Sequence, residues 1–137
     1  QMTEQGLLMQ TGDELTSPSA SDDTFHSAWL LSRAMQETWQ RYAVVLRVLE
    51  KEKTVARSNL EKQSCVIAER LSTLFGMSSP EFYDKNVLGS FVYALRENNL
   101  LKTLDSGSLE FSEDSLVLKK AIMELVWPEI AQHLEKI

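Results

Sequence analysis

The stretch that decides the fold is residues 25–50, which read FHSAWLLSRAMQETWQRYAVVLRVLE. Apolar side chains recur there at steps of three and four residues, which places them along one side of an α-helix. The spacing predicts one helix from about residue 22 to residue 50, about 40 Å long at 1.5 Å per residue. We expect the stripe to pack in the core, and it consists of Phe25, Ala28, Trp29, Met35, Trp39, Tyr42, Ala43, Leu46 and Leu49.

A stripe that contains Trp and Tyr has two other interpretations, a cofactor-binding face and a helix lying on a membrane surface. At helical spacing such residues belong to the core in most proteins. A surface-bound helix carries many Lys and Arg on its polar face, whereas this one has only Arg33, Arg41 and Arg47. No apolar run in the chain approaches the roughly 20 residues of a membrane span.

The composition is that of an ordinary globular chain. Of its 137 residues, 43% are hydrophobic and 25% are charged, which excludes a wholly disordered chain. Five glycines and three prolines are too few for a β-sandwich rich in tight turns. The single cysteine excludes an internal disulfide and a multi-cysteine metal site. The chain opens with Gln1 and without the basic and apolar regions of a signal peptide, which suggests a piece of a longer protein.

The net charge of −6 is concentrated at the start of the chain. Residues 1–24 hold five acidic groups and no Lys or Arg, and the remaining residues are nearly balanced. A nucleic-acid-binding surface needs clustered Lys or Arg to displace counterions. The densest group, Lys51, Lys53 and Arg57, is interleaved with two glutamates. We therefore expect no nucleic-acid partner.

Two short β-hairpins are expected from alternating apolar residues around turn residues. Residues 7–15 flank a turn near residues 12–13, and residues 100–111 flank one at residues 105–107. A polar loop at residues 16–23 connects the first hairpin to the long helix.

A charged connector at residues 51–57 leads to the next helix. That helix has the capping-box pattern Ser58-Asn-Leu-Glu61 at its start, in which the serine and glutamate side chains satisfy free backbone groups. Gly76 ends the helix because glycine adopts the left-handed conformation without a side-chain clash.

Proline residues mark the start or an interruption of two further helices. Ser79 and Pro80 form an N-cap followed by proline at the first helical position, and this helix is expected to break near residues 85–86. The final helix is capped by a serine between residues 112 and 115, and Pro128 kinks or restarts it.

These elements predict a mainly α fold, a helical bundle with two short β-hairpins. Each hairpin is preceded by a similar stretch and followed by an acidic loop and a helix, at an offset of 93 or 94 residues. The pattern is compatible with two winged-helix-like repeats. We expect residues 1–137 to form one helical domain, with a hairpin and the long helix in residues 1–57 and the other helices and hairpin in residues 58–137.

The chain offers no recognisable catalytic, cofactor or metal site. His26 and His133 lack a carboxylate or nucleophile at motif spacing, and each is expected to be a surface or cap histidine. Cys65 lies next to the apolar stripe of its helix, which favours a buried and inert thiol. We therefore assign no catalytic, cofactor-binding or metal-binding residue, and expect no chemistry from this chain alone.

The most distinctive stretch is Pro80–Lys85, which reads PEFYDK. Its simplest interpretation is the start of a helix with two aromatic side chains reaching the core and Asp84 favoured by the helix dipole. The alternative is an exposed docking surface formed by Glu81, Asp84 and Lys85.

With its flanks, this stretch resembles the C-terminal region of the bacterial membrane-associated glycerol-3-phosphate 1-O-acyltransferase family. The resemblance is a run of matches in order that extends from about Thr3 to about Leu125. It is carried by GDEL at residues 12–15, ETWQRYA at 37–43, LEK at 60–62, AERLS at 68–72, PEFYDK at 80–85 and LR at 95–96.

The resemblance implies a function for a longer parent protein. The parent would transfer an acyl group from acyl carrier protein or coenzyme A to the 1-hydroxyl of glycerol 3-phosphate, the first step of phospholipid synthesis, at the cytoplasmic face of the inner membrane. The family uses an upstream His-x-x-x-x-Asp motif, whose histidine removes the hydroxyl proton. The motif is absent from this chain. The resemblance therefore implies a non-catalytic domain whose partner is the catalytic domain of the parent.

A free-standing winged-helix-like protein-interaction module is the alternative. A helix at residues 58–75, a helix at 80–98 and a hairpin at 100–111 follow the order of such a module. The second helix carries Lys85 and Arg96 against three acidic residues, which disfavours DNA binding. The length of the parent reading frame distinguishes the two hypotheses.

Overall fold

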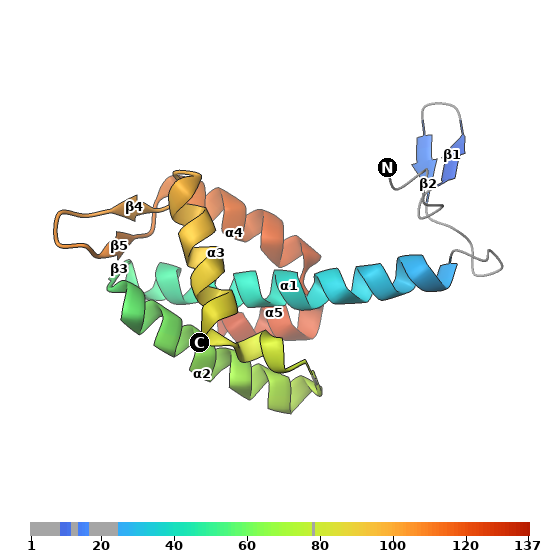
Figure 1. Ribbon diagram of the computed structural model, residues 1–137, viewed down its shortest axis with the longest axis horizontal. Coiled ribbons are helices and arrows are strands. Elements are labelled where there is room, and N and C mark those ends of the chain that lie inside the picture. The colour runs from blue at the N-terminus through green and yellow to red at the C-terminus, as the bar shows by residue number, and fades with distance from the viewer. Residues whose placement is uncertain (1–8, 12–13, 17–24, 78) are drawn as a thin grey trace. The chain divides into compact units, whose positions relative to one another are not determined.

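The computed structural model describes residues 9–11, 14–16, 25–77 and 79–137, and for residues 9–11, 14–16 and 28 it describes the backbone only. Helices predominate among these residues, so the predicted mainly α fold class is confirmed (Figure 1). The helices are α1 (Phe25–Glu52), α2 (Arg57–Phe75), the 3-10 helix η1 (Pro80–Tyr83), α3 (Lys85–Glu97), α4 (Glu113–Leu125) and α5 (Pro128–Glu135). The strands are β1 (Met9–Thr11), β2 (Glu14–Thr16), β3 (Thr54–Val55), β4 (Lys102–Thr103) and β5 (Leu109–Glu110).

The chain divides into two units, Gln1–Gln36 and Glu37–Ile137, and the boundary falls inside α1. In the first unit β1 and β2 pair antiparallel, with Gln10 opposite Leu15. This confirms the strands of the first predicted hairpin. Its turn, most of the loop that follows and the predicted first residues of the long helix lie outside the described residues.

The core of the second unit is built around the C-terminal half of α1. Four consecutive residues, Ala43–Leu46, have no exposed surface. Because consecutive residues of a helix point to different sides, α1 is covered all round at this level. Helices α2 to α5 supply the cover (Figure 1). Their core residues include Leu60, Ala68, Leu71, Leu88, Val92, Leu95, Ile122, Ile130 and Leu134.

The predicted core stripe of α1 is correct only in its second half. Ala43, Leu46 and Leu49 are fully buried, and the flanking Trp39 and Tyr42 are half-buried. The other described members are exposed, by 38% for Phe25, 47% for Trp29 and 41% for Met35. Periodicity shows which side of a helix is apolar but not whether another element covers it.

The start of α2 differs from the predicted capping box. The N-cap is Ala56, and it makes no side-chain capping bond. The carboxylate of Glu61 instead accepts a hydrogen bond from Nε of Arg57 at 2.8 Å. An arginine one turn before a glutamate offers a charged partner that outcompetes the neutral backbone N–H. The predicted end is confirmed, since Gly76 has φ 65° and donates its N–H to the carbonyl of Ser72.

The predicted connector at residues 51–57 contains a strand that the sequence analysis missed. Strand β3 pairs with β5, and β5 pairs with β4, so the sheet order is β3-β5-β4. The core residue Leu109 lies opposite both Val55 and Thr103. The second predicted hairpin is confirmed, and it forms two strands of this three-stranded sheet. Strand β3, helices α2 and α3 and the hairpin follow one another in the order of a winged-helix module.

The stretch from Ser79 onward forms two short elements rather than one broken helix. One 3-10 turn, η1, ends at Tyr83, and α3 begins at Lys85. Asp84 separates them as the N-cap of α3, since its Oδ1 accepts hydrogen bonds from the backbone N–H groups of Asn86 at 2.7 Å and Val87 at 3.2 Å. A break is present as predicted, but it falls at Asp84 and not at residues 85–86, which lie inside α3.

We expect the Asp84→Ala substitution to lower the free energy of unfolding by about 1 kcal/mol, because it leaves two N–H groups of α3 without their acceptor. Urea denaturation followed by circular dichroism measures the change. Asp84→Asn is the control, because an asparagine oxygen also caps a helix. An equal loss in both variants would show that the charge of Asp84, and not its capping bonds, stabilises the fold.

The last two helices begin at the predicted serine and proline residues. Ser112 caps α4 in a reciprocal pair with Ser115, whose hydroxyl also donates to the carbonyl of Leu100 at 2.6 Å. This bond attaches the start of α4 to the beginning of the hairpin. Pro128 is the first residue of α5, where its missing N–H costs no hydrogen bond, so the predicted restart is confirmed.

Candidate functional site

The two histidines belong to different units, and each has an aromatic ring as its neighbour. His26 belongs to the first unit and is exposed, with its ring stacked on Trp29 at a centroid distance of 6.1 Å. His133 lies in α5 and meets the ring of Phe75 edge-on at 6.2 Å. No hydrogen bond joins either imidazole to a carboxylate of the described residues.

Cys65 is half-buried on α2 rather than fully buried. Its partial burial raises the pKa of the thiol, because burial disfavours the charged thiolate. The thiol is therefore protonated at neutral pH and is a poor nucleophile. The described residues contain no group of His, Cys, Asp and Glu arranged to hold a metal ion. Within the same residues, no helix has the length and apolar character to cross a bilayer.

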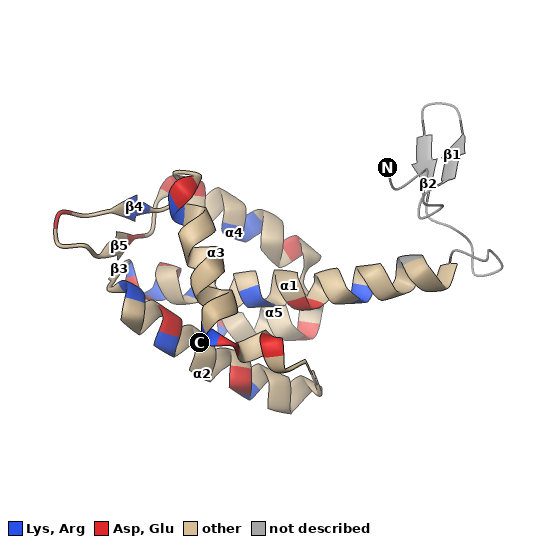
Figure 2. Ribbon diagram, in the orientation of Figure 1, with Lys and Arg blue, Asp and Glu red and all other residues tan. Residues whose placement is uncertain are grey.

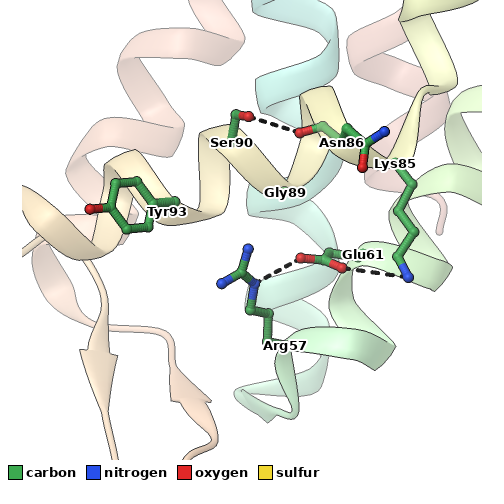
Figure 3. A pocket seen from close by; sticks show the side chains of 7 residues that line it. All are labelled: Arg57, Glu61, Lys85, Asn86, Gly89, Ser90 and Tyr93. Carbon is green, nitrogen blue, oxygen red and sulfur yellow. Dashed lines mark hydrogen bonds and ion pairs between the residues drawn. The ribbon is translucent and has the colours of Figure 1, made fainter.

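An open pocket lined mostly by polar residues lies between α2 and α3 (Figure 3). It is an open hollow of about 510 Å³, within the size range of small-molecule sites. One wall comes from the first turns of α2 and the other from α3. The lining residues are Arg57, Glu61, Lys85, Asn86, Gly89, Ser90 and Tyr93.

Gly89 allows the two helices to approach closely at the centre of the pocket. A Cβ atom at this position would lie 3.0 Å from Oε1 of Glu61, which is closer than ordinary van der Waals contact. The absent side chain therefore leaves space for the carboxylate against the backbone of α3. An isolated glycine within a helical pattern often marks such a packing site.

Glu61 is the charged centre of the pocket and has two basic neighbours. Its side chain is only 11% exposed, and it accepts a hydrogen bond from Nε of Arg57 at 2.8 Å. The second oxygen, Oε2, lies 3.9 Å from Nζ of Lys85. The basic side chains are more open, with 46% of Arg57 and 64% of Lys85 exposed. The three charges leave the pocket with a net charge of +1.

The bond to Glu61 orients the guanidinium of Arg57. Because Nε is engaged by the carboxylate, the two terminal nitrogens project into the hollow (Figure 3). They make no hydrogen bond to the residues that the structure describes. The hydroxyl of Ser90 is engaged, since it donates to the carbonyl of Asn86 at 2.9 Å.

The first turns of α2 and α3 both begin with a basic residue and contain no acidic one. A helix N-terminus carries partial positive charge, so basic residues there add to that charge instead of compensating it. Asp84 offsets part of it at the start of α3. Elsewhere along α2, basic and acidic residues alternate (Figure 2).

The distinctive stretch Pro80–Lys85 divides between the core and the surface. Phe82 is fully buried, but Tyr83 is 40% exposed, so only one of the two aromatic residues reaches the core. The hydroxyl of Ser79 donates to Glu81, and this bond is the main cause that lowers the pKa of Glu81. Of the three residues proposed as a docking surface, Lys85 alone lines the pocket.

Most of the pocket residues were not singled out by the sequence analysis. The sequence pattern places Arg57 only in a basic group too sparse for nucleic acid, and Glu61 only in a capping box and in the run that carries the family resemblance. The signal that could have found the pocket is Gly89, an isolated glycine in a helical pattern.

Comparisons with known proteins give one consistent result. Residues 1–103 match the family model described as the glycerol-3-phosphate acyltransferase C-terminal region. A protein of Alteromonas mediterranea named glycerol-3-phosphate acyltransferase is 58% identical over 132 residues, which are 96% of this chain and 16% of that protein. A protein of the same name from Pseudoalteromonas atlantica is 48% identical over 136 residues, 99% of this chain and 17% of that protein. No solved structure matches. The chain thus spans about one-sixth of the length of these relatives.

Proposed function

We propose that this chain, which belongs to the glycerol-3-phosphate acyltransferase family as its C-terminal region, is a non-catalytic docking region of a larger enzyme. The whole enzyme would transfer an acyl group from acyl carrier protein or coenzyme A to the 1-hydroxyl of glycerol 3-phosphate. It would act at the cytoplasmic face of the inner membrane, with this region associated peripherally. The long relatives favour this function over a free-standing winged-helix-like module.

The observation that carries the docking role is the uncovered apolar stripe of α1. Phe25, Trp29, Leu31 and Met35 recur at helical spacing in the part of α1 that belongs to the first unit, and each is exposed by 38–47%. Several large apolar residues exposed on one helix face are typical of an interaction surface. The occupant that we propose is the preceding part of the family chain, because it makes up about five-sixths of the relatives' length.

The docking proposal is tested in a full-length chimera in which this chain replaces the matching region of the Alteromonas mediterranea relative. We expect Trp29→Glu combined with Met35→Glu to make the region dissociate from the rest of the enzyme. If the double substitution lowers the free energy of docking by about 1.4 kcal/mol, the undocked population rises tenfold. Cleavage at a specific protease site engineered at the junction measures that population.

Leu30→Glu is the matched control. Leu30 is 49% exposed and lies off the stripe, so the same apolar-to-acidic change should leave cleavage unchanged. Equal acceleration by Leu30→Glu, or no acceleration by the double variant, would contradict docking through the stripe. Loss of docking should lower the stability of the enzyme or its membrane assembly before it alters the choice of acyl donor.

The non-catalytic assignment has a separate test. The purified chain is incubated with glycerol 3-phosphate and labelled palmitoyl-coenzyme A. We expect no turnover above a buffer blank, because acyl transfer needs a positioned base and donors for the developing oxyanion. Turnover that disappears in His26→Ala or His133→Ala would overturn the assignment.

A further inference from the structure

We infer that the pocket between α2 and α3 binds a phosphate monoester group. The donors are the two terminal nitrogens of Arg57 and Nζ of Lys85, which come from different helices and lie on either side of the Glu61 carboxylate (Figure 3). This binding is distinct from the docking role, because it uses another surface and needs no other part of the enzyme.

The arrangement of Arg57 favours an oxyanion. Its planar guanidinium presents paired N–H groups that match two oxygens of a phosphate. The bond from Nε to Glu61 fixes the plane of the guanidinium, so less side-chain entropy is lost on binding. Glu61 is therefore a positioning residue: it holds the arginine and does not itself contact the anion.

Lys85 supplies the second charge. Its Nζ lies 3.9 Å from Oε2 of Glu61, beyond hydrogen-bonding distance, so its three N–H donors remain available to a ligand. Two cations against one carboxylate give a net attraction for an anion. The basic first turn of α2 adds to it, since a helix N-terminus also favours negative charge and α2 has no side-chain cap.

The space and the exposed walls fit a phosphate that is attached to a small organic group. The hollow holds about 510 Å³, far more than one phosphate needs. Gly89 lets the carboxylate of Glu61 and the guanidinium of Arg57 lie against α3, because a side chain there would meet them. The ring of Tyr93 forms one wall and is 51% exposed. A phosphate monoester could reach this pocket either as a free metabolite or as the headgroup of phosphatidic acid.

Binding is measured by NMR titration of the 137-residue chain with inorganic phosphate at constant ionic strength. We expect saturable shifts of the Gly89 and Ser90 amide signals. Lys85→Gln and Arg57→Gln should each weaken the affinity at least about fivefold. Arg70→Gln, a charge removal at an exposed position of the same helix outside the pocket, should leave it unchanged. Because Lys85 is 64% exposed, its variant tests the proposal even if Arg57→Gln unfolds the chain.

Two further arms identify the source of the phosphate. Glycerol 3-phosphate represents a free ester, and vesicles containing phosphatidic acid represent the headgroup, with phosphatidylglycerol vesicles as the diester control. Saturable binding in either arm that is lost in Lys85→Gln supports the site. The proposal is overturned if inorganic phosphate, glycerol 3-phosphate and the phosphatidic acid vesicles all fail to bind. It is also overturned if Arg70→Gln weakens binding as much as Lys85→Gln does. Neither outcome affects the docking test, which depends on α1.

Discussion

Replacement of Phe82 by alanine should lower the free energy of unfolding by about 3–5 kcal/mol, the usual cost of truncating a buried phenylalanine. Phe82 has no exposed surface and is among the largest fully buried side chains of the described residues. It lies in η1, which packs against α2 and α3. Its loss would leave a cavity where these elements meet, because cores relax only partly around a missing ring.

The neighbouring Tyr83 provides the control for this prediction. It belongs to the same 3-10 turn but is 40% exposed, so Tyr83→Ala should cost no more than about 1 kcal/mol. Urea denaturation of both variants, followed by circular dichroism, measures the difference. Similar losses would mean that the turn, and not the buried ring, holds η1 in place.

The second large effect is expected at Glu50, which holds together a network of charges. Its Oε2 accepts hydrogen bonds from Nη1 of Arg47 at 2.6 Å and Nζ of Lys119 at 2.8 Å. Arg47 also donates through Nε to the carbonyl of Leu134 at 2.9 Å. The carboxylate therefore links α1 to α4 and orients the arginine that binds the end of α5.

Glu50→Gln should lower the free energy of unfolding at neutral pH by about 2 kcal/mol. The change keeps the shape of the side chain but leaves two cations, each 15–20% exposed on its side chain, without their counter-charge. This is below the roughly 3–5 kcal/mol for breaking a fully buried pair, because water still reaches the network. Glu124→Gln at an exposed position of α4 is the matched control and should be neutral.

The effect of Glu50 should disappear in acid. Burial by itself raises the pKa of Glu50, but hydrogen bonds from Lys119 and Arg47 outweigh it, so the pKa is lowered on folding. Such a carboxylate contributes its full stabilisation above its unfolded pKa, about 4.3 for glutamate. The contribution is lost as the pH falls through the lower pKa of the folded state. Urea denaturation of the unchanged chain and of Glu50→Gln at pH 7 and near pH 3 tests this. A difference in their free energies of unfolding that persists at low pH would contradict it.

Local patterns were sufficient to locate most elements. The apolar spacing of residues 25–50, the glycine after Phe75 and the serine before α4 depend on interactions within one or two turns, so neighbouring residues settle them. Such patterns failed where two local partners competed. The sequence around Glu61 matches a capping box. In the folded chain its carboxylate binds the side chain of Arg57 instead, which is a stronger partner than a backbone N–H group.

The sequence by itself determined where the helices and hairpins lie and which side of each helix is apolar. Tertiary structure decided which parts of those sides are covered, since Leu46 is buried and Trp29 is exposed although the sequence pattern assigns both to one stripe. Tertiary structure also determined that a third strand pairs with the hairpin and that the pocket forms. Val55 meets Leu109, and Gly89 meets Glu61, only after the chain has folded. These contacts join residues 28 to 54 positions apart in the sequence. Helical and strand periodicity describes a residue's own element, whereas contacts over such distances depend on how whole elements cross.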